Sequence, residues 1–135
     1  MVRVGDNGAG VVLKLAINIS LAAQTLAFSE GLLLAERGGV DVRLAAQVMA
    51  SSPIGSPALK ARAPLLLELP DSAWFTVALM HKDIDLARGE GRRMGITMPS
   101  ASAAAEALDI ADRLGYAQRD IASLHQVLAK ISEHT

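Results

Sequence analysis

The sequence predicts an all-α fold, a helical bundle around one long central helix near the N-terminus. Hydrophobic residues make up 51% of the 135 positions and aromatic residues only 3%, so the apolar content comes mainly from Ala, Leu, Val and Ile. Ala and Leu are strong helix formers. No segment shows the period-two alternation that is typical of a half-buried strand. The length suits one domain, and residues 1–135 are predicted to form a single helical unit.

The first predicted helix runs from Gly10 to Arg37 and ends at the pair Gly38-Gly39. It is apolar on nearly every side, which predicts a central helix packed all round. The apolar run also has the length of a membrane span, but Lys14 lies inside it. A lysine at the centre of a span costs about 2.5–3.5 kcal/mol on insertion scales. We therefore expect a buried helix of a cytoplasmic protein that has no membrane partner.

Cap residues mark the helices that follow. Asp41 is the predicted N-cap of a helix through about Ala50. Ser56 followed by Pro57 begins a further helical turn, and residues 65–71 are expected to be extended or irregular. Three more helices are predicted over residues 73–94, 101–114 and 120–132, with Gly95, Ser100, Gly115 and Asp120 at their ends.

The charge balance and residue types exclude several classes of protein. Thirteen Lys and Arg stand against 14 Asp and Glu, without the basic surplus of a nucleic-acid-binding domain. The absence of cysteine excludes disulfides and thiolate metal sites. The three histidines have no partners at ligand spacing, so no metal site is predicted. The first residues also lack the pattern of a secretion signal.

The glycines Gly5, Gly8 and Gly10 form a G-x-x-G-x-G pattern at the start of the first helix. A dinucleotide-binding fingerprint has the order G-x-G-x-x-G and lies between a strand and a helix. Here the order is reversed and only a few residues precede it. A phosphate-binding role remains one alternative, and a flexible lead-in to the helix is the favoured one.

Lys14 and Asn18 are four residues apart, so they lie on the same side of the first helix. The residues around them are apolar. A lysine in such a place either extends to solvent or is held beside a cleft, where it suits a general acid/base. The amide of Asn18 would then orient a substrate or the ammonium group.

Lys82 and Asp83 form a second polar pair in the middle of a predicted helix. Adjacent helical residues diverge by about 100°, so the two side chains cannot pair face to face. Either both are ordinary surface charges, or one of them points into the protein and needs a partner there.

Three motifs, in this order and at these distances, resemble the β-hydroxyacid dehydrogenase family. GDNGAGVVLKLAIN matches its pattern G-x-x-G-x-G-x-x-x-K-x-x-x-N, and FTVALMHKDIDLA matches an aromatic residue followed seven positions later by K-D and then L-A. GITMPSASAAAEAL and LGYAQRDIASL match its closing segments. The family includes 3-hydroxyisobutyrate dehydrogenase, tartronate semialdehyde reductase and the glyoxylate/succinic semialdehyde reductases, relatives of 6-phosphogluconate dehydrogenase. The resemblance is to its helical C-terminal domain and extends from Val4 to about Leu128.

The resemblance implies roles for the residues that match the motifs. Lys14 matches the family's catalytic lysine, Asn18 matches the partner that positions the substrate, and Phe75 matches an aromatic near the substrate pocket. The segment SPIGSPALKA is most similar to the semialdehyde/glyoxylate reductase branch. Ile17 stands where relatives often carry another asparagine, and residues 51–56 lack the aromatics of some branches, which leaves the substrate size open.

The resemblance also implies the cofactor contacts. Lys82 and Asp83 match the K-D pair at the edge of the cofactor and active site, and Gly8 and Gly10 match hinge glycines between the two domains. The cofactor would be NAD or NADP, bound mainly by a Rossmann domain that would precede residue 1. That domain is absent from this chain.

In the resembling enzymes a nicotinamide gives hydride to an aldehyde or keto carbon, and the lysine gives the proton to the oxygen. The implied partners are a small hydroxyacid or semialdehyde, a Rossmann domain in cis or in trans, and a second copy of the chain in a homodimer. The chain alone would be incomplete and inactive. The alternative is an orphan helical module that dimerises without catalysis.

Overall fold

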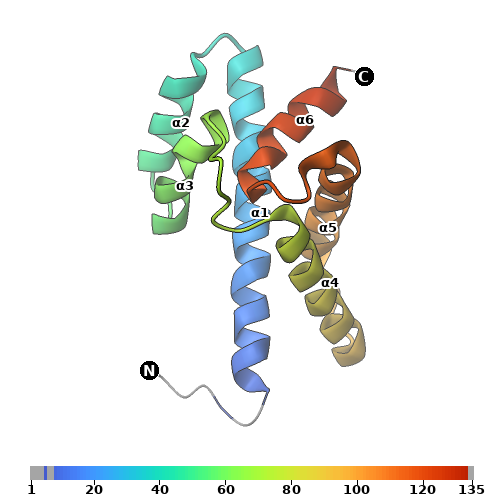
Figure 1. Ribbon diagram of the computed structural model, residues 1–135. Coiled ribbons are helices and arrows are strands. Elements are labelled where there is room, and N and C mark those ends of the chain that lie inside the picture. The colour runs from blue at the N-terminus through green and yellow to red at the C-terminus, as the bar shows by residue number, and fades with distance from the viewer. Residues whose placement is uncertain (1–4, 6–7, 134–135) are drawn as a thin grey trace.

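The computed structural model describes residues 5 and 8–133, and within these residues it contains six α-helices and no strand. The predicted all-α fold is confirmed. The long helix α1 (Ala9–Arg37) forms the axis of the molecule. Figure 1 shows α2 and α3 on one side of its C-terminal half, and α4, α5 and α6 on the other side. The N-terminal half of α1 therefore has neighbours on one side only.

Helix α1 ends as predicted at the glycine pair. The Gly38 N–H donates to the Leu34 carbonyl at 3.0 Å, and Gly39 takes a φ of 96°, which an L side chain rarely adopts. Helix α2 (Val42–Ser51) begins at the predicted cap, since the Asp41 carboxylate accepts a hydrogen bond from the Leu44 N–H at 3.0 Å.

Helix α3 (Pro57–Leu67) is longer than the single turn predicted from Ser56-Pro57. Ser56 caps it as expected and accepts a hydrogen bond from the Leu59 N–H. The prediction that residues 65–71 are irregular is wrong for 65–67. Pro64 lies inside the helix and cannot donate a backbone hydrogen bond, but burial of Leu59, Ala63 and Leu66 against α1 and α2 continues the helix past it.

Helix α4 (Val77–Met94) starts later than the predicted residue 73. Thr76 is its N-cap and accepts from the Leu79 N–H at 3.1 Å, while residues 73–75 run across the molecule in a non-helical segment. The predicted end is confirmed, because Gly95 adopts a left-handed conformation with φ 73°.

The last third of the chain is helical with two irregular junctions. Helix α5 (Pro99–Ala111) has proline in its first turn and does not use the predicted Ser100 cap. It passes into the wide turn η1 (Asp112–Tyr116), where Gly115 has a φ of 95°. Asp120 caps the short 3-10 turn η2 (Ile121–Ser123), which leads directly into α6 (Leu124–Ser132).

Two hydrophobic clusters hold these helices to α1. The larger joins α1 to α4, α5 and α6 and includes Met80, Ile84 and Leu108, all 0% exposed. The smaller joins α1 to α2 and α3 around Phe28 and Leu32. Burying one large aliphatic side chain contributes about 1.5–3 kcal/mol, so the two clusters fix the C-terminal half of α1 firmly between both groups of helices.

The prediction that α1 is packed all round is wrong for its N-terminal half. Val11, Leu13 and Ile17 are 62%, 45% and 60% exposed. By length and composition alone α1 could cross a membrane, but core helices of soluble proteins pass the same test. Only 28% of its most apolar window is buried within the structure. Apolar side chains therefore remain uncovered where α1 begins.

Candidate functional site

A buried hydrogen bond joins α1 to α4 at the centre of the candidate site. Asn18 Nδ2 donates to Asp83 Oδ2 at 2.9 Å, and the two residues are only 7% and 6% exposed. Leu15 and Ala22 are buried on either side of Asn18 along α1. The expectation that one member of the Lys82-Asp83 pair turns inward is confirmed for Asp83, and its partner is Asn18.

This hydrogen bond fixes how Asn18 is oriented. One N–H of its Nδ2 is used by Asp83, which leaves the second N–H to donate and Oδ1 to accept from a ligand. Lys14 lies one helical turn before Asn18 on the same side of α1 and is exposed. A lysine at the surface one turn from a buried, oriented amide is placed to serve as a proton donor for a ligand that contacts both.

Exposed residues continue the site along both helices. The residues Val11, Lys14 and Ile17 follow one another along α1 at steps of three, and Leu79, Lys82 and Leu86 form one stripe on α4. Val11 and Leu86 line the same cavity, so the two stripes meet where the start of α1 approaches the end of α4. We call these six residues the open α1/α4 face.

The cavity at the end of this face measures about 480 Å³ and lies between the start of α1 and the end of α4. Gly8, Ala9 and Val12 form one wall, and Glu90 and Arg93 form part of the other. Arg93 is paired with Glu90 at 2.6 Å, and this hydrogen bond raises the pKa of the Arg93 guanidinium.

Gly10 lies one turn before Lys14 and is exposed. A Cβ added there would meet nothing within 4 Å. The approach to the helix at this point is therefore open to another molecule or domain.

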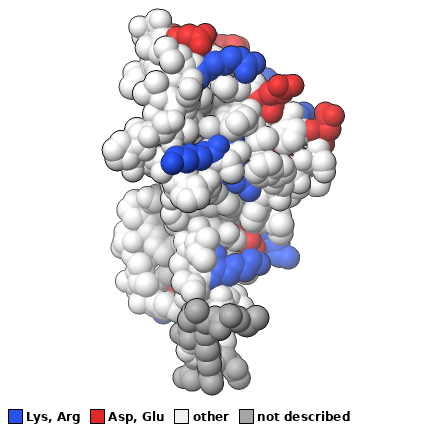
Figure 2. Space-filling model, turned by 90° about the vertical axis from the view of Figure 1, so that its left-hand side faces the viewer, with Lys and Arg blue, Asp and Glu red and all other residues white. Residues whose placement is uncertain are grey.

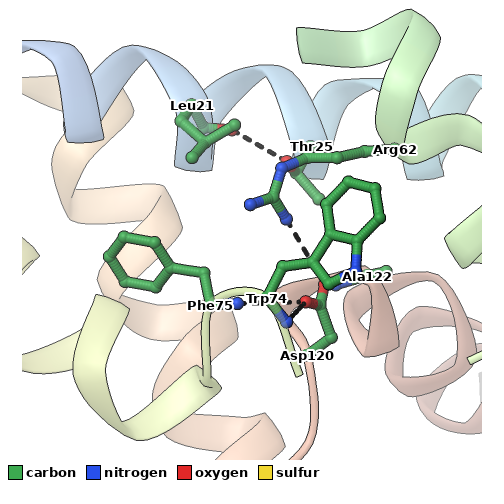
Figure 3. A network of polar contacts seen from close by, with 7 residues as sticks. All are labelled: Leu21, Thr25, Arg62, Trp74, Phe75, Asp120 and Ala122. Atoms are coloured by element: carbon green, nitrogen blue, oxygen red, sulfur yellow. Dashed lines mark hydrogen bonds and ion pairs between the residues drawn. The ribbon is translucent and has the colours of Figure 1, made fainter. Parts of the chain in front are cut away.

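Phe75 lies in the segment before α4, where a buried carboxylate holds the chain. Asp120 is 0% exposed, and its Oδ2 accepts hydrogen bonds from the backbone N–H groups of Trp74 at 2.8 Å and Phe75 at 3.2 Å. Figure 3 shows the two aromatic rings pointing in opposite directions, and Phe75 packs against the larger hydrophobic cluster. The same cluster contains Ala22, one turn after Asn18 on α1, and Ile84, the residue after Asp83 on α4.

The loop before α3 packs against α1 next to this region. The Ser56 hydroxyl donates to Gln24 Oε1 at 2.9 Å. Gly55 is required in the loop because a Cβ there would overlap the carbonyl oxygen of Ala50. The loop therefore has a fixed position between α2 and α3, against the middle of α1 at Gln24.

The structure brings some of the predicted site residues together and leaves others apart. Asn18 and Asp83 are in direct contact, and Lys14 lies next to them. Lys82 is exposed and points to solvent beside Asp83. Figure 2 shows the side of the molecule that carries α2 and α3, where the basic side chains stand apart with uncharged surface between them. Within residues 5 and 8–133, no group of three His, Asp or Glu side chains is placed to hold a metal.

Asp120 is the residue whose role the sequence did not reveal. Its position before a helical segment predicted the N-cap, which is confirmed by the hydrogen bond from the Ala122 N–H at 2.9 Å. Nothing in the spacing of Asp120 from Phe75 predicted that the same carboxylate also holds the segment before α4. Such long-range contacts have no periodic signal in one sequence.

Comparisons with known proteins show the family to which the chain belongs. A family model described as NAD-binding of NADP-dependent 3-hydroxyisobutyrate dehydrogenase matches residues 8–128. The chain is 28% identical over 131 residues to 2-hydroxy-3-oxopropionate reductase from Escherichia coli, covering 97% of the chain and 45% of that protein. It is 26% identical over 124 residues to glyoxylate/succinic semialdehyde reductase 2 from Arabidopsis thaliana, covering 92% of the chain and 35% of that protein.

Solved structures share the fold. A 3-hydroxyisobutyrate dehydrogenase from Salmonella typhimurium superposes with a TM-score of 0.82 at 21% identity, over 89% of this chain and 42% of that one. The Mycobacterium tuberculosis 3-hydroxyisobutyrate dehydrogenase solved with L-serine gives 0.77 at 26% identity, over 90% and 44%. The chain thus spans less than half the length of these relatives. The match over residues 8–128 shows that the chain belongs to the NAD-binding domain family of the 3-hydroxyisobutyrate dehydrogenases.

Proposed function

We propose that this chain is the helical half of an NAD(P)-dependent hydroxyacid dehydrogenase or semialdehyde reductase, in which Lys14 is the general acid/base. The observation that carries the proposal is the buried Asn18–Asp83 hydrogen bond. This bond supports the proposal because it fixes Asn18 one helical turn after Lys14, on the same side of α1. Two relatives are named as reductases of glyoxylate, succinic semialdehyde and 2-hydroxy-3-oxopropionate, and these names support a small semialdehyde or oxoacid as substrate.

The residues of this chain would handle the proton and the position of the substrate. A bound nicotinamide supplies the hydride for the carbonyl carbon. The Lys14 ammonium donates its proton to the carbonyl oxygen, and in the reverse direction the neutral amine removes the hydroxyl proton. Asn18 Oδ1 accepts a hydrogen bond from the substrate hydroxyl or from Lys14, while Phe75 covers the apolar side of a small substrate. General acid/base groups of this kind contribute about 10²–10⁴-fold to the rate.

The described residues fit the edge of a cofactor site better than a whole one. The 480 Å³ cavity and the open α1/α4 face offer two lysines and an apolar strip but do not surround a dinucleotide. Lys82 and the open backbone at Gly10 would contact the cofactor from one side. A nucleotide-binding domain, in cis or in trans, would supply the other side and cover Ile17, Leu79 and Leu86, whose exposure otherwise costs solvation free energy.

The experiment that tests the proposal is a graft. The segment of the E. coli 2-hydroxy-3-oxopropionate reductase that this chain matches is replaced by this chain, and NADH and NADPH oxidation is measured with small semialdehydes and 3-oxoacids. Turnover that requires Lys14 supports the proposal. A folded, cofactor-binding graft without turnover contradicts it, and the E. coli enzyme itself is the positive control.

The chain alone gives a second test of the same proposal. Titration with NADH and NADPH, followed by nicotinamide fluorescence, should show no binding at micromolar cofactor. Micromolar binding would mean that the chain carries a complete cofactor site.

We also propose that the chain forms a homodimer, because the exposed apolar residues of α2 and the adjoining loops, Val40, Leu44, Val48 and Ile54, lie apart from the open α1/α4 face. Sedimentation at several concentrations tests this, and a monomer at all of them would contradict it.

A further inference from the structure

We propose that Asp120 is a positioning residue that sets the place of Phe75 at the substrate site. This inference rests on the proposed function. Asp120 belongs to the turn before α6 and does not contact the open α1/α4 face. It acts through the backbone of residues 74–75, which it holds by hydrogen bonds.

The hydrogen bonds of Asp120 use both of its carboxylate oxygens. Oδ2 accepts from the backbone N–H groups of Trp74 and Phe75, and Oδ1 accepts from the N–H of Ala122. An ordinary N-cap needs only the contact with Ala122. The two bonds from Oδ2 instead connect segments about 45 residues apart in the sequence. A buried carboxylate with this many donors fixes the backbone around it strongly.

Arg62 brings a third element into the same network. Its Nη1 lies 3.4 Å from Asp120 Oδ1, and its guanidinium lies 5.6 Å from the centre of the Trp74 ring. The Arg62 side chain is 12% exposed, so this charge is partly desolvated and needs its partner. Figure 3 shows Arg62 reaching from α3 between α1 and Trp74 to the Asp120 carboxylate. Asp120 therefore joins α3, the segment before α4 and the start of α6.

Two further backbone hydrogen bonds hold the chain on either side of Phe75. The Phe75 carbonyl accepts from the Ile121 N–H at 3.0 Å, and the Val77 N–H donates to the Arg119 carbonyl at 2.9 Å. Phe75 thus has both its N–H and its carbonyl fixed by the turn that contains Asp120. With its backbone fixed, the Phe75 ring can move only by rotation about its side-chain torsion angles. Loosening this turn would move Phe75 without touching Lys14 or Asn18.

Replacing Asp120 with asparagine tests the role with almost no change in size. An amide has only one acceptor oxygen, so its NH₂ must face either the Trp74 and Phe75 N–H groups or the Ala122 N–H and Arg62. In either orientation donors oppose donors, and the segment before α4 or the turn before α6 is released. Asp85→Asn is the matched control, because Asp85 is exposed and pairs only with neighbours on α4.

The first readout needs no catalysis. Trp74 is the only tryptophan of the chain, so its emission reports the network directly. Trp74 is already 58% exposed, so we expect Asp120→Asn to shift its emission only slightly to the red and to increase its quenching by acrylamide, while Asp85→Asn changes neither. Arg62→Met keeps the backbone bonds to Asp120 and removes the cation above the ring, so it should alter the emission without increasing the quenching. Unchanged emission and quenching in a folded Asp120→Asn protein would overturn the proposal.

The second readout uses the graft described above. Asp120→Asn should raise KM about tenfold, the loss expected when hydrogen bonds to a charged group no longer hold a contact residue, and leave kcat within about threefold, since the proton donor is untouched. Asp120→Glu restores the charge and should recover part of the KM. A lower melting temperature with unchanged KM, or a fall in kcat as large as the rise in KM, would overturn the positioning role. An inactive wild-type graft would refute the proposed function and leave the fluorescence test of Asp120 intact.

Discussion

Asn18 and Asp83 should be energetically coupled through their hydrogen bond, and a double-mutant cycle measures that coupling free energy. Both residues are less than a tenth exposed, and the bond of 2.9 Å ends on a carboxylate. Hydrogen bonds to charged groups contribute about 1.5–3 kcal/mol to folding, and a buried carboxylate left without its donor costs at least as much. Asn18→Ala should therefore lower the free energy of unfolding by about 2–3 kcal/mol, which for a domain of this size lowers Tm by about 6–15 °C.

The cycle combines Asn18→Ala and Asp83→Ala, each alone and together, with unfolding in urea followed by circular dichroism. The expected coupling free energy is about 1.5 kcal/mol or more, because each single variant removes the same interaction. The control cycle pairs Asn18→Ala with Asp85→Ala and should give a coupling within about 0.5 kcal/mol. A coupling below about 0.5 kcal/mol for Asn18 and Asp83 would refute the reasoning that this bond orders the site.

Three further predictions concern stability, each measured by chemical denaturation. Leu32→Ala should cost about 2–5 kcal/mol because Leu32 is 0% exposed in the α1–α3 cluster, and a loss below about 1 kcal/mol would contradict that packing. Gly55→Ala should cost about 1–3 kcal/mol, since its Cβ would overlap the Ala50 carbonyl, whereas Gly89→Ala on α4 should stabilise by up to about 1 kcal/mol. Ser123→Ala should be neutral or slightly stabilising, because the buried Ser123 hydroxyl has no hydrogen-bond partner among the residues that the structure describes, and a loss above about 1 kcal/mol would show that this hydroxyl is satisfied.

The helices were largely predictable because their ends depend on local chemistry. Asp41 and Ser56 act as caps, and Gly39 and Gly95 have the positive φ that stops a helix. The start of α4 was not predictable in this way. Phe75 and its neighbours look helical by composition, but hydrogen bonds to the turn before α6 pull them into an extended path, and Thr76 then caps the helix.

The site was predictable only in part. The spacing of Lys14 and Asn18 placed them on one side of α1. The divergence of Lys82 and Asp83 left two alternatives, both side chains at the surface or one turned inward, and the second holds for Asp83. That Asp83 meets Asn18 follows from how α1 and α4 pack, which no periodic pattern in the sequence encodes. The exposed N-terminal half of α1 was missed for a similar reason, since an apolar sequence does not reveal which molecule or domain covers it.

The most direct test of the account is the turnover of the graft with Lys14 intact and with Lys14→Met. A methionine keeps most of the apolar length of the side chain and removes the proton donor. The account predicts that kcat falls by about 10²-fold or more, while cofactor binding and Tm stay close to those of the unsubstituted graft. A Lys14→Met graft that turns over at the unsubstituted rate would contradict the claim that Lys14 is the general acid/base.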